Sequence, residues 1–153
     1  MRVVAVIGSS NSTEEEYQIA YEVGKELAKR GLAVVCGGRT GVMEAVCRGA
    51  KEEGGITIGI MPSYEGNEAN PYVDIKINTG MGWNRNPIVV ASGEMVIAIG
   101  GHWGTLSEIA YALILGKYIV GYKTHGIEGV DFARTKEEIL GKVDEFFKTT
   151  AGN

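Results

Sequence analysis

The chain alternates short runs of apolar, largely β-branched residues with longer segments of helical periodicity, and this alternation constrains its fold more than any other feature. The short runs predict strands over residues 2–7, 32–36, 56–60, 72–77, 95–100 and 118–122. The longer segments predict helices over residues 14–30, 42–53, 84–92, 105–115 and about 136–148. Strands joined by crossover helices form a parallel sheet that is covered on both faces. We therefore expect an α/β fold with a doubly wound, mainly parallel sheet.

One domain spanning residues 1–153 accounts for the whole chain. A chain of 153 residues is long enough to bury a core without disulfides or metals. No linker and no repeat interrupts the pattern. The apolar run at the N-terminus is too short for a secretory signal, and no segment is long enough to span a membrane. We expect a cytoplasmic protein with no membrane partner.

Charge and cysteine content narrow the classes of partner and cofactor. The net charge of −4, without any basic run, argues against binding to a nucleic acid polymer. Cys36 and Cys47 are predicted to be buried free thiols, and no spacing of Cys and His residues suits a metal. No lysine lies in the loops predicted to form the site, so a pyridoxal-phosphate decarboxylase has no chemical support. No cofactor is expected.

Glycine-rich loops follow several of the predicted strands and mark the candidate site. In parallel sheets the ligand lies beyond the carboxyl ends of the strands. The loop after the first strand, GSSN, lacks the GxGxxG dinucleotide pattern, and no loop has the GK[ST] of a P-loop. The loops GGRTG and GGHWGT each follow a buried strand and open a helix, where unpaired N–H groups favour an anion. Together they predict a phosphate site.

Glu108 has two interpretations from its spacing. Thr105 and Glu108 fit a capping box, as do Thr13 with Glu16 and Thr135 with Glu138 at other helix starts. The GGHWGT loop before Thr105 instead suggests a role for Glu108 at the ligand. Both interpretations are compatible with one another.

The motifs GGRTGVMEA, GWNRN and GGHWGTLSE, in this order, resemble the Lonely Guy (LOG) family over most of the chain, from Gly8 to about Tyr122. The resemblance implies a Rossmann-like nucleotide-binding domain, a homodimer or homotetramer, and a phosphoribohydrolase that releases the base from nucleoside 5′-monophosphates. It also implies Arg85 and Glu108 as the catalytic pair. The residues implied to bind phosphate or nucleotide are Gly8, Ser9, Gly37, Gly38, Arg39, Thr40, Gly41, Met43, Gly100, Gly101, Gly104 and Thr105.

Three positions depart from the pattern of that family. Ile99 replaces the proline before the glycine pair, Asn86 replaces the lysine after the arginine, and Glu44 replaces a glycine after Met43. These features resemble a divergent branch that is also similar to molybdenum-cofactor carrier proteins. This branch implies binding of a phosphorylated pterin without hydrolysis.

Two functions follow as hypotheses, and both take a phosphorylated small molecule as partner. In the first, Glu108 stabilises an oxocarbenium-like transition state or positions water during N-glycosidic hydrolysis, while Arg85 fixes the phosphate or the departing base. Glu44 is the obvious second carboxylate, and Trp83 and Trp103 are candidates to stack on a base. In the second, the chain is a non-catalytic carrier or sensor of a nucleotide or a pterin.

Overall fold

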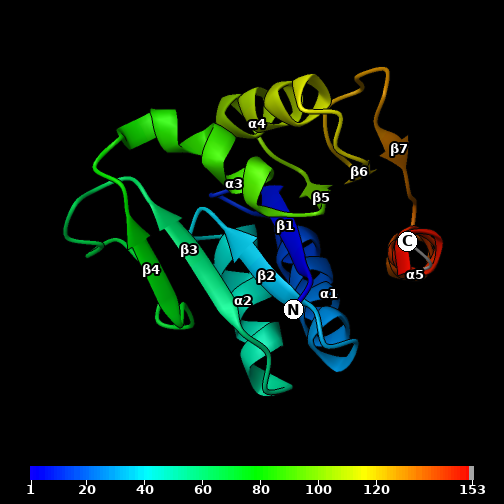
Figure 1. Ribbon diagram of the computed structural model, residues 1–153, viewed down its shortest axis with the longest axis horizontal. Coiled ribbons are helices and arrows are strands. Elements are labelled where there is room, and N and C mark those ends of the chain that lie inside the picture. Colours follow the sequence, from blue (N-terminus) through cyan, green and yellow to red (C-terminus); the bar gives the residue numbers. More distant parts are fainter. Residues whose placement is uncertain (152–153) are drawn as a thin grey trace.

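The computed structural model describes residues 1–151, and its elements follow the predicted alternation (Figure 1). The strands are β1 (Val3–Gly8), β2 (Ala33–Cys36), β3 (Thr57–Met61), β4 (Ile75–Asn78), β5 (Met95–Ile99), β6 (Ile119–Tyr122) and β7 (Asp131–Phe132). The helices are α1 (Glu14–Lys29), α2 (Val42–Glu52), the 3₁₀ helix η1 (Gly82–Arg85), α3 (Asn86–Ser92), α4 (Trp103–Ile114) and α5 (Lys136–Ala151).

The strands form one sheet in the order β4-β3-β2-β1-β5-β6-β7, and every neighbouring pair is parallel. The predicted doubly wound α/β fold is thus confirmed. The chain adds strands outward from β1 in one direction up to β4, and then starts again at β5 on the other side of β1. The sheet therefore reverses its winding between β1 and β5, which is where such folds form their ligand crevice.

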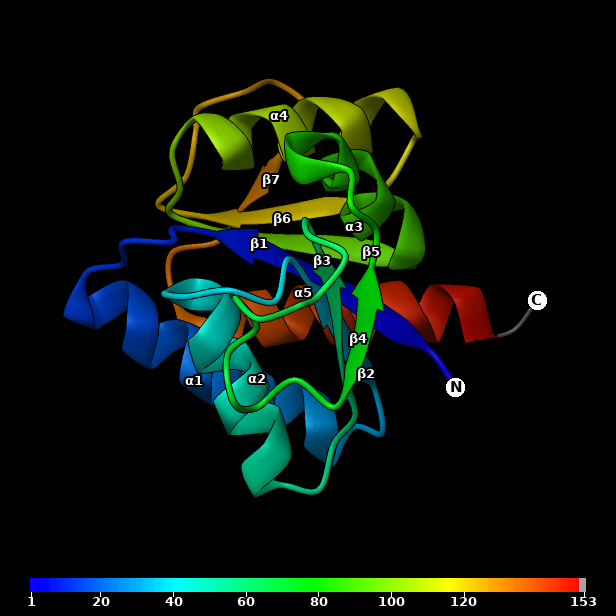
Figure 2. The ribbon, with the colours of Figure 1, turned by 90° about the vertical axis from the view of Figure 1, so that its left-hand side faces the viewer.

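Helices cover both faces of the sheet. Figure 2 shows α3 and α4 on one side, with α1, α2 and α5 on the other. Alternate residues of β1 pack on opposite faces of the sheet. Val4 and Val6 pack in the cluster with α1 and α2, whereas Ala5 and Ile7 pack with α3 and α4. A central strand buried on both faces explains why β1 and β5 are continuous apolar runs rather than alternating ones.

Two details of the strand prediction were wrong. The segment from Asp131 to Phe132 pairs with β6 as a seventh strand, although two residues are too few to carry a period-2 pattern. The alternating segment predicted over 72–77 forms a strand only over Ile75–Asn78. The Tyr72 carbonyl instead accepts a 2.6 Å hydrogen bond from the Thr57 hydroxyl, so the residues before Ile75 form a turn.

A close crossing of α1 and α2 depends on two glycines. A Cβ atom on Gly24 would lie 2.2 Å from the carbonyl oxygen of Val46, and one on Gly49 would lie 2.0 Å from that of Tyr21. Each glycine therefore lets the backbone of one helix touch the backbone of the other. This crossing holds the two helices that begin after the first two site loops.

Candidate functional site

A cavity of about 690 Å³ opens at the carboxyl edge of the sheet, over the point where the winding reverses. Its walls come from the loops after β1, β2 and β5, from η1 and from the starts of α3 and α4. In Figure 2 this edge lies on the left, where β1 ends and α4 begins. Segments far apart in the sequence thus meet at the place that the parallel sheet predicts.

Most of the residues predicted for the site border this cavity. They are Gly8, Ser9, Gly37, Arg39, Met43, Arg85, Gly100, Gly101, Gly104, Thr105 and Glu108.

Gly38, Thr40 and Gly41 do not border the cavity, and each supports the site loops instead. The Gly38 carbonyl accepts a 2.9 Å hydrogen bond from the amide of Asn70, and the Thr40 hydroxyl donates a 2.9 Å bond to the carbonyl of Ser10. Gly41 is the N-cap of α2, and its carbonyl accepts from the amide of Ala45. The GGRTG loop therefore has two roles: Gly37 and Arg39 border the cavity, and the other three residues hold neighbouring segments in place.

The loops after β1 and β5 are joined directly to each other. The Gly101 amide donates a 2.7 Å hydrogen bond to the hydroxyl of Ser9, and the Ser9 amide donates a 3.2 Å bond to the carbonyl of Ile99. Gly100 and Gly101 have φ angles of 61° and 107°, in the region that only glycine adopts without strain. The glycine pair is thus required by the turn that bends the chain from β5 into α4.

The predicted capping box of Thr105 and Glu108 is wrong. The helix α4 begins at Trp103, so Thr105 lies in its first turn and Glu108 in its second. The N-cap is His102, whose side chain makes no capping hydrogen bond. The capping box predicted for Thr13 and Glu16 is present, and Thr135 accepts the amide of Glu138 as predicted.

Without a side-chain cap, the first turn of α4 presents free N–H groups to the cavity. In the described part of the chain, the amides of His102, Trp103, Gly104 and Thr105 donate to no protein acceptor. All four residues line the cavity. Unpaired amides at a helix start, together with the helix dipole, form a favourable environment for an anion.

Arg85 is buried in the cavity wall and is held rigidly. Its Nε atom donates a 2.9 Å hydrogen bond to the carbonyl of Ile60, and Nη2 donates a 3.4 Å bond to the carbonyl of Gly37. A third bond runs from Nη1 to the side-chain oxygen of Asn86. Burial lowers the pKa of Arg85 from its ordinary value, and the nearby Glu108 opposes this shift. Arg85 therefore ties β3, the GGRTG loop and α3 together.

Glu108 is 9% exposed, and its carboxyl faces the cavity. Within residues 1–151 the Glu108 carboxyl makes no hydrogen bond and no ion pair. Every fully enclosed side-chain nitrogen or oxygen of the described chain does have a hydrogen-bond partner. The Glu108 oxygens are therefore not fully enclosed, and they border the open cavity. Burial raises the pKa of Glu108 to about 8, and the positive charge of Arg85 offsets only part of this shift. The group is thus largely protonated at neutral pH.

The cavity also contains residues that the sequence did not point to. Lys123, just after β6, lines the cavity with Ser10, Asn11, Thr13 and Glu16. The loops predicted to form the site contain no lysine, but the loop after β6 was not among them and brings Lys123 to the same edge. A lone lysine after a strand carries no motif, so only its position after β6 could have suggested it.

The structure also shows where the two tryptophans, Asn86 and Glu44 lie relative to the cavity. Trp83 and Trp103 both line the cavity, as does Asn86. Glu44 does not border it, and its carboxylate accepts a 3.0 Å hydrogen bond from the Tyr17 hydroxyl. The second carboxylate at the cavity is Glu16 instead.

Further sequence expectations concern thiols, metals and membranes. Cys36 and Cys47 are buried free thiols, as predicted. Among residues 1–151 no group of three or more His, Cys, Asp or Glu side chains is arranged to hold a metal ion. None of the described helices has the length and apolar character needed to cross a membrane.

Comparisons with known proteins agree with this architecture. An uncharacterized protein of Archaeoglobus fulgidus is 43% identical over 138 residues, covering 90% of this chain and 91% of that one. The rice cytokinin riboside 5′-monophosphate phosphoribohydrolase LOG is 30% identical over 135 residues, or 85% of this chain. This chain spans only 55% of the length of that enzyme.

A solved structure agrees over most of the chain. The molybdenum cofactor binding protein of Rippkaea orientalis superposes with a TM-score of 0.90 at 33% identity, covering 95% of this chain and 97% of that one. The predicted resemblance to both LOG enzymes and molybdenum-cofactor proteins is therefore confirmed. The model of the SLOG cluster4 family matches residues 1–148, so this chain belongs to the SLOG cluster4 family.

Proposed function

We propose that the cavity binds a phosphorylated small molecule, either a nucleoside 5′-monophosphate or a phosphorylated pterin, with its phosphate on the first turn of α4. The observation that carries this proposal is the set of unpaired amides of His102, Trp103, Gly104 and Thr105 at the cavity wall. An anion that bridges these N–H groups satisfies donors that the helix itself leaves without partners.

Charges around the cavity support the same assignment. Arg39 and Lys123 line it from opposite loops, after β2 and after β6. Lys123 forms a 2.7 Å ion pair with Glu15, so its ammonium is held at this edge. The names of the relatives point the same way, since the rice enzyme acts on a nucleoside monophosphate and the Rippkaea protein binds the molybdenum cofactor.

Binding without hydrolysis is the function that the geometry favours. The Arg85 guanidinium already donates to Ile60, Gly37 and Asn86, which leaves it few donors for a substrate. Glu108 is largely neutral at pH 7, whereas stabilising an oxocarbenium-like transition state requires an ionised carboxylate. The proteins that match over their whole length include the molybdenum cofactor binding protein.

Hydrolysis of the N-glycosidic bond is the second candidate, and the unpaired Glu108 carboxyl is the observation that favours it. A carboxyl with a pKa of about 8 is suited to act as a general acid near neutral pH. In this scheme Glu108 protonates the departing base as the bond between C1′ and the base nitrogen breaks, and the water that adds to C1′ gives a proton back to the Glu108 carboxylate. The products are the free base and ribose 5-phosphate.

Binding is tested by comparing each phosphorylated ligand with its dephosphorylated counterpart. We expect AMP, GMP or molybdopterin to raise the thermal unfolding midpoint, and adenosine and guanosine to raise it much less. Equal shifts with AMP and adenosine contradict a phosphate site. No shift with any of the phosphorylated ligands contradicts the proposed function as a whole.

Hydrolysis is tested by chromatography of AMP and cytokinin monophosphates after incubation with high concentrations of the protein. Hydrolysis is supported if the wild type and the surface variant Glu65→Gln release free base while Glu108→Gln does not. A wild-type protein that binds AMP but releases no base is a binding protein for these ligands.

A further inference from the structure

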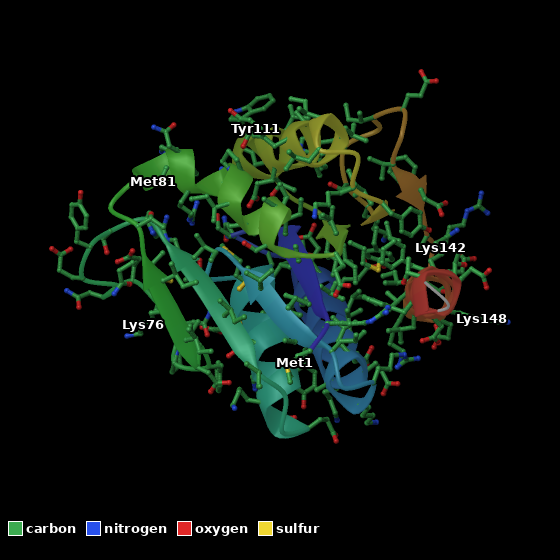
Figure 3. All side chains as sticks on the ribbon, in the orientation of Figure 1. Met1, Lys76, Met81, Tyr111, Lys142 and Lys148 are labelled. Carbon is green, nitrogen blue, oxygen red and sulfur yellow. The ribbon has the colours of Figure 1, made fainter. Side chains whose placement is uncertain are left out.

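A second hollow of about 370 Å³ adjoins the main cavity on the outer side of α4. It shares Trp83, Asn86, Trp103 and Gly104 with the main cavity, so the two hollows lie next to each other at the first turn of the helix. The rest of its lining consists of Asn84, Pro87, Ser107 and Tyr111. Figure 3 shows Tyr111 on the side of α4 that faces away from the sheet.

The lining of this hollow is aromatic and carries no full charge at neutral pH. Trp83 and Trp103 are 72% and 69% exposed, although large aromatic side chains usually bury most of their surface. They are also the only two tryptophans in the chain. Two exposed indoles at the mouth of one cavity form an apolar surface that a planar group can cover by stacking.

The floor between the two hollows is ordered by hydrogen bonds. Asn86 donates a 3.2 Å bond from Nδ2 to the hydroxyl of Ser107, which donates a 2.7 Å bond to the carbonyl of Gly104. A Cβ atom on Gly104 would lie 3.3 Å from the Trp83 ring, so this indole rests on the helix backbone. The Trp103 ring lies 4.6 Å from the ring of His102, between centroids.

Trp103 therefore lies in the same turn as the free amides of α4, and Trp83 of η1 packs against this turn at Gly104. Gly104 contributes an unpaired N–H to the proposed phosphate site and borders the aromatic hollow. A ligand whose phosphate lies on these amides has its remaining atoms within reach of the indoles.

We propose that this hollow is the subsite for the planar, uncharged heterocycle of the phosphorylated ligand, which stacks on Trp83 and Trp103. The inference rests on the proposed function, because it places the ring relative to a phosphate on α4. It makes the two tryptophans the residues that distinguish a base-bearing or pterin-bearing ligand from a plain sugar phosphate. Stacking tolerates any flat ring, so adenine, guanine and pterin rings all suit the subsite.

The test measures the affinities of AMP, GMP and ribose 5-phosphate for the wild type and for Trp83→Leu and Trp103→Leu. Both side chains are exposed, so the folded state tolerates their replacement. We expect the wild type to prefer the nucleotides to ribose 5-phosphate, and each leucine variant to lose about tenfold in nucleotide affinity. Affinity for ribose 5-phosphate stays unchanged. Tyr64→Leu is the matched control, since Tyr64 is 76% exposed and borders neither hollow.

Tryptophan fluorescence gives a second readout, because a stacked base changes the emission of both indoles and ribose 5-phosphate does not. If neither the nucleotides nor ribose 5-phosphate nor molybdopterin bind, the proposed function falls and this inference with it. If ribose 5-phosphate binds as tightly as AMP and GMP, or the leucine variants keep the wild-type preference, the inference alone falls. A third outcome also overturns the inference: the leucine variants change the oligomeric mass in light scattering while their ligand affinities stay constant. In that case a second copy of the chain covers the indoles.

Discussion

The backbone amide of Gly101 donates a 2.7 Å hydrogen bond to the side-chain hydroxyl of Ser9. The two residues are far apart in the sequence, but they follow the neighbouring strands β1 and β5 at the point where the sheet reverses its winding. This bond closes one wall of the cavity and orients the turn that leads into the free amides of α4. The site is therefore built on a contact between two loops, and neither loop forms it alone.

Replacing Ser9 by alanine removes the acceptor of the Gly101 amide. We expect Ser9→Ala to lower the free energy of unfolding by about 1 kcal/mol, the usual net contribution of one hydrogen bond. Urea unfolding measures the change. Ser10→Ala is the control, because no hydrogen bond of the described chain uses its hydroxyl although Ser10 lines the same cavity. A loss as large in Ser10→Ala would contradict the role given to Ser9.

The raised pKa of Glu108 makes stability depend on pH in a definite direction. Between the unfolded value of 4.5 and the folded value of about 8, the folded state retains a proton that the unfolded state has lost. The free energy of unfolding therefore falls as pH rises through this window, by at most about 1.4 kcal/mol per pH unit from this group. Glu108→Gln removes this contribution to the pH dependence, so the variant gains stability relative to the wild type from pH 5 to pH 8.

Urea unfolding at several pH values tests this sign. The control is Glu65→Gln, which replaces an exposed carboxylate outside the cavity. A difference between Glu108→Gln and the wild type that is constant from pH 5 to pH 8 would mean that Glu108 titrates as an ordinary surface carboxyl.

Arg85 is expected to tolerate lysine poorly. Lysine cannot reproduce a planar fork that donates at once to the carbonyls of Ile60 and Gly37 and to the side chain of Asn86. Arg85→Lys should cost about 2 kcal/mol of unfolding free energy, because buried acceptors lose charged donors. Arg39→Lys is the matched control, since Arg39 is exposed at the same cavity. Equal stabilities of the two variants would show that the bonds of Arg85 are not structural.

Two glycines in helices should respond in opposite directions to replacement by alanine. Alanine is the better helix former, but a Cβ atom on Gly24 would meet the Val46 carbonyl oxygen at 2.2 Å. We expect Gly24→Ala to destabilise the protein by about 3 kcal/mol, because α1 and α2 must move apart. In α5, a Cβ atom on Gly141 meets nothing within 4 Å, so Gly141→Ala should stabilise by up to about 1 kcal/mol. Calorimetric unfolding midpoints of the two variants should therefore shift in opposite directions.

Much of the fold could be predicted because periodicity is local. The β-branched runs that became β1 and β5 need no tertiary information to be recognised, and parallel pairing follows from the helices between them. The glycine loops after β2 and β5 could be placed at one edge for the same reason. The two-residue strand β7 could not, because its only signal is its pairing with β6.

The chemistry of the site was decided by the tertiary structure. The spacing of Thr105 and Glu108 is identical to that of Thr13 and Glu16, yet only the second pair caps a helix. The difference arises because the Gly100-Gly101 turn, held by Ser9, starts α4 two residues before Thr105. That shift frees the amides of the first turn and leaves the Glu108 carboxyl unpaired in a buried wall. The sequence by itself determined that residues of the glycine loops after β1, β2 and β5 reach one edge of the sheet, because periodicity is local and parallel strands all end at the same edge. Only packing decided which of them are free to meet a ligand, because hydrogen-bond partners and burial come from segments distant in the chain.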